Sequence, residues 1–132
     1  MNNKKIRRIT SNENILFKTT DPYGRKVICE KDYYFEHICN KKKGREYLSN
    51  QEEIKEFIRT IEHPNESFGY ARDRDYSNRI VYMTKHKSNE FYNRVVVEYE
   101  NESFEGVGVV KTALQPSNVR EGDKPLWLEE TN

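Results

Sequence analysis

The chain has 132 residues, a length typical of one domain, and its 23 Lys+Arg nearly balance its 22 Asp+Glu. Only 34% of the residues are apolar, but 9 Tyr, 6 Phe and 1 Trp supply large side chains for a core, which excludes a disordered chain. No apolar run approaches the ~20 residues that span a bilayer, and the basic start Met1–Arg8 lacks the apolar stretch of a signal peptide.

We therefore expect a soluble, cytoplasmic protein with no membrane partner and a single domain over residues 1–132. Residues 1–13 are expected to be flexible. Residues 115–132 are expected to form a C-terminal tail, because prolines and glycine interrupt regular structure there. Within that tail, the apolar segment Leu126–Leu128 is able to fold back onto the domain as an anchor.

The first predicted element is a β-hairpin. Its strands are Asn14–Thr19 and Arg25–Glu30, which flank the turn segment Asp21–Gly24. Pro22 presets φ at the second turn position and the glycine closes the turn.

Two helices are predicted after the hairpin. The first is short and lies within residues 31–40, where apolar side chains are spaced three to four residues apart. The second begins at Ser49, which forms a capping box with Glu52, and ends at His63-Pro64. One apolar stripe of this helix faces a core, because its members follow the spacing i, i+3, i+4, i+7: Ile54, Phe57, Ile58 and Ile61.

The rest of the chain has the two-residue period of strands. The candidates are separated by polar linkers and are Phe68–Arg72, Arg79–His86, Tyr92–Glu100 and Val107–Leu114. The expected fold class is α+β, with an N-terminal hairpin and two helices packed on one face of an antiparallel sheet of about four strands.

The sequence contains none of the common metal- or phosphate-binding motifs that we searched for. There is no glycine-rich phosphate loop, no HExxH motif and no paired-cysteine spacing, so we expect no metal site and no cofactor. Three histidines can transfer protons near neutral pH: His37, His63 and His86. Cleavage of RNA without a metal needs a base for the 2′-OH proton, an acid for the 5′-oxygen and donors for the phosphorane oxygens. The composition is sufficient for that mechanism.

Charge is distributed unevenly along the chain. Residues 1–59 carry 14 Lys+Arg against 9 Asp+Glu, a formal charge of +5, which permits binding of a polyanion such as RNA. A solvated lysine-rich loop is the alternative interpretation of either basic cluster.

The order of these features resembles the phage-type subgroup of the barnase–EndoU–colicin–RelE-like nucleases of phage and toxin systems. The matching pieces are a YFEHI helix segment, an IEHP helix end and three strand segments, at Tyr34–Ile38, Ile61–Pro64, Arg79–Tyr82, Arg94–Val97 and Val110–Ala113. The likeness covers about residues 14–115.

The resemblance implies His37 as the acid–base residue and Thr112 near the scissile phosphate, with basic or tyrosine side chains around it. We accordingly predict four catalytic residues, His37, Thr112, Tyr82 and Lys111, and six substrate-binding residues, Lys41, Lys42, Lys43, Arg45, Arg79 and Arg94. Many relatives carry an Arg-His-Pro-Glu-like segment after the histidine, whereas this chain has Cys39–Arg45. The lysines there are point charges without the bidentate grip of arginine, and the second histidine is missing.

Each assignment has a structural alternative. His37 follows Tyr33 and Tyr34 at helical spacing, which is also the pattern of a packed core histidine. Tyr82 shares a strand face with Ile80 and is as readily a core residue. Arg79 and Arg94 lie in strands, where a solvated rim is the ordinary environment. Lys111 and Thr112 face opposite sides of a regular strand, so both reach one site only through a β-bulge, and of the two we favour Thr112.

These observations predict a small metal-independent ribonuclease, a toxin or phage-associated effector that cleaves RNA through a 2′,3′-cyclic phosphate. Its partners would be RNA, including tRNA, and an inhibitory immunity or antitoxin protein. The alternative is a non-catalytic RNA- or protein-binding domain, or a phage accessory protein, that keeps the same fold.

Overall fold

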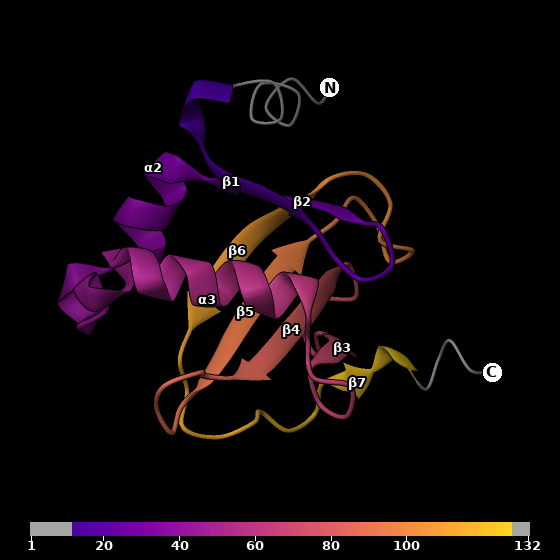
Figure 1. Cartoon of the computed structure of the whole chain (residues 1–132). Coiled ribbons are helices and arrows are strands. Elements are labelled where there is room, and N and C mark those ends of the chain that lie inside the picture. Colours follow the sequence, from indigo (N-terminus) through magenta and orange to yellow (C-terminus); the bar gives the residue numbers. More distant parts are fainter. Residues whose placement is uncertain (1–11, 128–132) are drawn as a thin grey trace.

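The computed structural model describes residues 12–127, which form a seven-stranded mixed sheet with helices on one face (Figure 1). The strands are β1 (Ile15–Thr20), β2 (Lys26–Glu30), β3 (Tyr70–Arg72), β4 (Arg79–Lys85), β5 (Tyr92–Glu98), β6 (Gly108–Leu114) and β7 (Lys124–Pro125). The helical segments are η1 (Asn12–Asn14), α2 (Lys31–Tyr33), the π-helix η2 (Tyr34–Ile38), η3 (Lys41–Lys43), η4 (Glu46–Ser49) and α3 (Gln51–Glu62). The predictions for residues 1–11 and for Leu128 lie outside the described residues.

The α+β class is confirmed, but the prediction of an antiparallel sheet of about four strands is wrong. The strand order is β1-β2-β6-β5-β4-β3-β7, so the N-terminal hairpin joins the main sheet instead of standing apart. It does so through a parallel pair in which Val27 lies opposite Gly108 and Ile28 opposite Val109. Parallel neighbours need a long crossover, which here contains both helices and three strands. No local pattern reveals such a pairing.

The prediction of an irregular tail is also wrong in part. Lys124 and Pro125 form β7, which pairs with β3 at the sheet edge, where the missing N–H of a proline is tolerated. The next residue, Leu126, is buried, and the indole Nε1 of Trp127 donates to the backbone oxygen of Ser67 at 3.2 Å. The chain from 115 to 125 therefore returns along the sheet and closes its β3 edge.

Helix α3 packs on the sheet as its apolar stripe predicts. Phe57 and Ile61 are fully buried, and Ile54 and Ile58 are partly buried against the same cluster. Figure 1 shows the helix crossing β6, β5 and β4 on one face. The predicted capping box is wrong: Asn50 is the N-cap and accepts the backbone N–H of Glu52 at 2.9 Å, because Ser49 is taken up by the preceding 3-10 turn.

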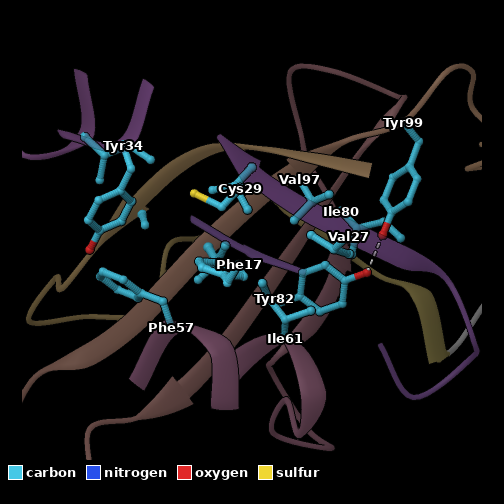
Figure 2. Packing of buried hydrophobic residues seen from close by; sticks show 14 of the residues in the cluster. Phe17, Val27, Cys29, Tyr34, Phe57, Ile61, Ile80, Tyr82, Val97 and Tyr99 are labelled. Carbon is cyan, nitrogen blue, oxygen red and sulfur yellow. Dashed lines mark hydrogen bonds between the residues drawn. The ribbon is translucent and has the colours of Figure 1, made fainter. Parts of the chain in front are cut away.

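The main core lies between the helices and the sheet. It is built from alternate residues of β2, β4 and β5, from Val110 and Ala113 of β6 and from aromatic side chains (Figure 2). Its members include Phe17, Val27, Tyr34, Phe57, Ile80, Tyr82 and Val97. A smaller cluster of Val81, Met83 and Val96 lies on the opposite face, where Val119 of the returning C-terminal segment packs against it. Among residues 12–127 no helix covers the rest of that opposite face, and we call it the open face.

Candidate functional site

A β-bulge in β6 changes which residues reach the open face. Val97 pairs with Val110 and Val96 with Thr112, so Lys111 is an extra residue in the ladder. Val110 and Ala113 both belong to the helix-side core, and the two residues between them are half-buried. Lys111 and Thr112 therefore both point away from that core. The bulge thus removes the alternation that would send these two side chains to opposite faces of the sheet.

Tyr33 connects β6 to the short helix that carries His37. Its hydroxyl donates to the backbone oxygen of Lys111 at 2.8 Å, and the Lys111 ammonium lies 5.5 Å from the centre of its ring. The His37 imidazole lies 4.9 Å from the same ring, in a tilted arrangement. His37 itself is exposed, and not packed in the core. Burial is the main cause that raises the pKa of Tyr33, so its phenol stays protonated at neutral pH as a hydrogen-bond donor.

An arginine–carboxylate pair, Arg79 and Glu98, lies on the open face of the β4–β5 pair. The Arg79 guanidinium contacts Glu98 through Nη2 at 3.0 Å and through Nε at 3.1 Å. The same guanidinium covers the ring of Tyr76 at 4.0 Å. The charge of Arg79 lowers the pKa of Tyr33 and the charge of Glu98 raises it, both less than burial does. We call Tyr33, His37, Arg79, Glu98, Lys111 and Thr112 the open cluster.

The surface beside His37 is acidic. A hollow of about 240 Å³ is lined by Asn14, Glu30, Asp32, Tyr33, Glu36 and His37. Its three carboxylates, Glu30, Asp32 and Glu36, line the same hollow as the imidazole and are groups that can accept a proton. They also repel phosphate, so an RNA backbone would have to approach from the Lys111 and Arg79 side.

The basic residues after the helix form an exposed turn. Lys41, Lys42 and Lys43 are a 3-10 turn capped by Asn40, whose side chain accepts the Lys42 N–H at 2.9 Å. All three lysines are exposed, and Arg45 is half-buried. Lys41 forms a loose pair with Glu46 at 3.7 Å. The turn is an exposed cationic surface, separated from the helix of His37 by Cys39 and Asn40.

Two predicted site residues are buried elsewhere. Tyr82 is fully buried in the main core, where its hydroxyl donates to Asp21 at 2.6 Å and lies 2.9 Å from the Tyr99 hydroxyl (Figure 2). Burial raises the pKa of Tyr82, so it is a neutral core residue without access to a substrate. Tyr82 is therefore a core residue, the alternative to its predicted catalytic role.

Arg94 is enclosed and does not form a solvated rim. Its side chain is 7% exposed and contacts Asp123 at 3.3 Å and Asp73 at 4.0 Å. The returning C-terminal segment supplies Asp123, so the arginine holds that segment against the sheet. Binding of a phosphate would require this ion pair to open.

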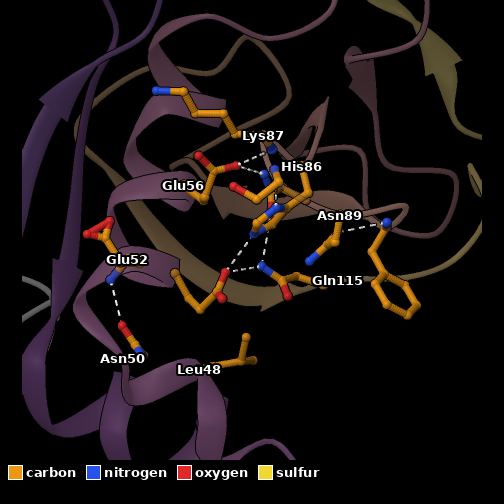
Figure 3. A network of polar contacts seen from close by, with 12 residues as sticks. Leu48, Asn50, Glu52, Glu56, His86, Lys87, Asn89 and Gln115 are labelled. Atoms are coloured by element: carbon orange, nitrogen blue, oxygen red, sulfur yellow. Dashed lines mark hydrogen bonds and ion pairs between the residues drawn. The ribbon is translucent and has the colours of Figure 1, made fainter.

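A second group of polar side chains lies between α3 and the sheet. We call Glu53, Glu56, His86, Asn93 and Gln115 the closed cluster (Figure 3). The His86 Nε2 lies 2.9 Å from Glu53, and its Nδ1 accepts the backbone N–H of Ser88 at 3.0 Å. Gln115 donates to both Glu53 and Asn93, and Asn93 donates to Glu56. Every member is tied to its neighbours.

Sequence reasoning missed Tyr33 and Glu98. Tyr33 was interpreted only as a helix-packing aromatic, although it lies one helical turn before His37 and their rings meet. Glu98 was assigned no role, although it lies directly opposite Arg79 in the β4–β5 pair. Antiparallel pairing of these two strands in their observed register places the charges of Arg79 and Glu98 opposite each other.

Comparison of the chain with protein-family models, curated proteins and solved structures found no match. Within residues 12–127, no group of three or more His, Cys, Asp or Glu side chains is arranged to hold a metal ion. The part of the chain that the structure describes also contains no helix with the length and apolar character needed to cross a membrane.

Proposed function

We propose that this protein is a small metal-independent ribonuclease that cleaves RNA by transesterification to a 2′,3′-cyclic phosphate, with the open cluster as its active site. The observation that carries the proposal is the β6 bulge. It turns Lys111 and Thr112 to the same face and sets the Lys111 ammonium beside Tyr33, whose ring also contacts His37.

The groups divide into roles by their chemistry. His37 is exposed and transfers a proton to or from the reacting oxygens, and a carboxylate of the adjacent hollow is the second proton-transfer group. Lys111 and Arg79 stabilise the charge of the phosphorane, and the Thr112 hydroxyl donates to one of its oxygens. Tyr33 positions the lysine and the imidazole relative to each other.

The remaining assignments concern binding. The exposed turn Lys41–Lys43 and Arg45 attract the RNA backbone without sequence preference. Arg94 and Tyr82 are not part of the proposed site, because both are buried. A ribonuclease of this kind, with RNA or tRNA as its substrate, would need an inhibitory immunity or antitoxin protein in the cell that produces it.

Incubation of the purified protein with total RNA in the presence of EDTA tests the proposal. We expect cleavage to continue, with products ending in a 2′,3′-cyclic phosphate, and we expect the His37→Ala variant to cleave about 10²–10⁴-fold more slowly. Loss of cleavage in EDTA with recovery in magnesium would show a metal-dependent mechanism instead. RNA that is retained but never cut would favour the non-catalytic binding domain.

A further inference from the structure

A pocket separate from the open cluster lies where the N-terminal hairpin, the end of α3 and the end of the described chain meet. It has a volume of about 520 Å³ and is lined by Pro22, Tyr23, Glu62, His63, Pro64, Asn65, Glu66, Tyr70 and Trp127. No lysine or arginine is among these residues. The proposed ribonuclease activity does not use this pocket.

Aromatic side chains form part of its wall. Tyr23 stacks on Tyr70 with ring centres 4.7 Å apart and an interplanar angle of 18°. Tyr23 is 54% exposed and Trp127 is 39% exposed, so both rings present surface to a ligand. The hydrogen bond from the Trp127 indole to Ser67 anchors the tryptophan at the pocket. Exposed aromatic rings held in place attract cations through their electron-rich faces.

The guanidinium of Arg25 already makes cation–π contacts with both tyrosine rings. The Arg25 guanidinium lies 5.7 Å from the centre of Tyr23 and 5.9 Å from the centre of Tyr70, and it is held by Asp21 at 3.4 Å. Arg25 does not line the pocket. Its position shows that the tyrosine pair is compatible with a positive charge beside it.

The rest of the wall contains two acidic side chains beside His63, Asn65 and two prolines. Glu66 contributes an exposed carboxylate, and Glu62 contributes a second one, which also accepts a hydrogen bond from the Thr19 hydroxyl. The pocket also adjoins the C-terminal end of α3, a helix of 12 residues that ends at Glu62. The C-terminus of a helix carries partial negative charge from its aligned peptide dipoles and favours cations. Aromatic rings, carboxylates and the helix end therefore select the same kind of ligand.

We propose that this pocket binds the cationic side chain of a lysine or arginine presented by a basic segment of a partner protein. The aliphatic part of such a side chain packs against the prolines and aromatic rings, while its charged end lies near the carboxylates. A nucleic acid fits poorly, because its phosphates would be repelled by the two glutamates and by the helix end. The proposal does not depend on the ribonuclease activity.

Trp127 is the single tryptophan of the chain, so its fluorescence and its indole N–H resonance report on this pocket alone. The probe is the lysine analogue N-acetyl-lysine methylamide, titrated into the full chain, with the norleucine analogue as the uncharged control. We expect a saturable change at Trp127 with the lysine analogue and none with norleucine. Added salt should weaken the lysine response.

Variants with matched charge changes locate the effect. Glu66→Gln removes a carboxylate of the pocket and should weaken lysine binding roughly two- to fivefold, the value of one exposed ion pair. Glu52→Gln makes the same change at the other end of α3, where the side chain is 76% exposed, and should leave binding unchanged. Tyr23→Ala should weaken binding by a similar roughly two- to fivefold through loss of the cation–π contact.

Three results would overturn the proposal. An equal response to norleucine would show an apolar groove without charge selection. Equal losses in Glu66→Gln and Glu52→Gln would show a general charge effect. A response to uridine or adenosine monophosphate at lower concentration than to the lysine analogue would show a nucleotide site. Circular dichroism of each variant confirms that the fold is intact.

Discussion

The open and closed clusters contain the same kinds of groups but differ in burial and in pairing. Each has a histidine, a carboxylate and side-chain hydrogen-bond donors. In the closed cluster the His86 side chain is 7% exposed and both of its ring nitrogens have partners. In the open cluster the His37 side chain is exposed, and its imidazole lies against the ring of Tyr33. The comparison teaches that residue types alone do not identify a site.

The two carboxylates show the same contrast. Glu56 of the closed cluster accepts hydrogen bonds from Arg59, the Lys87 N–H and Asn93, so its lone pairs are in use. Burial alone would raise the pKa of Glu56, but these hydrogen bonds outweigh it and lower the pKa to about 2. Glu98 of the open cluster has one arginine partner and remains half-exposed. A satisfied, enclosed group stabilises the fold, and an accessible group is available for a substrate.

The largest expected effect separates the three histidines. His37→Ala should lower kcat by about 10²–10⁴-fold with little change in stability, because it removes a proton-transfer group from an exposed position. His63→Ala, at another exposed histidine, should keep full activity. His86→Ala should lower the free energy of unfolding while leaving the activity of the folded fraction unchanged. Steady-state kinetics measures kcat and urea unfolding measures the free energy of unfolding, both on the same preparations. Wild-type activity in His37→Ala would remove the open cluster from the mechanism.

The next effect concerns the bulge. Thr112→Val keeps the shape of the side chain and removes its hydroxyl, so we expect kcat to fall by about 10²-fold or more, as for the loss of one donor to a transition-state oxyanion. Thr84→Val, in the hydrogen-bonded interior, is the matched control and should lower stability without lowering the activity of the folded protein. Unchanged kcat in Thr112→Val would mean that the bulge has a structural role in the sheet and no role in catalysis.

Glu56 of the closed cluster should make the free energy of unfolding depend on pH. Because the pKa of Glu56 is lower in the folded chain, at about 2, than in the unfolded chain, its contribution is complete above about pH 4.5 and is lost as the pH falls towards 2. Glu56→Gln should remove that part of the acid transition and cost about 1–3 kcal/mol at neutral pH. Urea unfolding at a series of pH values tests this. A variant with the same acid transition as the wild type would contradict the assignment.

The smallest expected effect lies in the exposed turn. Replacing Lys41, Lys42 and Lys43 with Gln should raise KM by roughly tenfold or less and flatten its salt dependence, with kcat nearly unchanged, because these charges act on the bound ground state as well. A triple Gln variant of the exposed lysines Lys18, Lys55 and Lys124 has the same net charge and should change KM less. If kcat collapses while KM stays constant, one lysine of the turn is catalytic.

Local patterns were enough to predict much of the fold. The hairpin, the stripe of α3 and the three long strands follow from alternation, helical spacing and turn residues, all of which depend on near neighbours in the chain. The observed bounds differ from the predicted ones by one or two residues in β4, β5 and β6. The position of His37 on a short helix was predicted in the same way, although its segment Tyr34–Ile38 is a π-helix.

The candidate site depended on contacts that no local pattern contains. The parallel pairing of β2 with β6, the edge strand β7 and the burial of Arg94 under residue Asp123 each join segments far apart in the sequence. The bulge at Lys111 is an offset between two strands and has no signature within β6 alone. The sequence by itself determined the elements and the residue types, because each element satisfies its own backbone and periodicity. Only the tertiary structure decided which charges stay accessible, because burial and pairing are properties of surfaces brought together by folding.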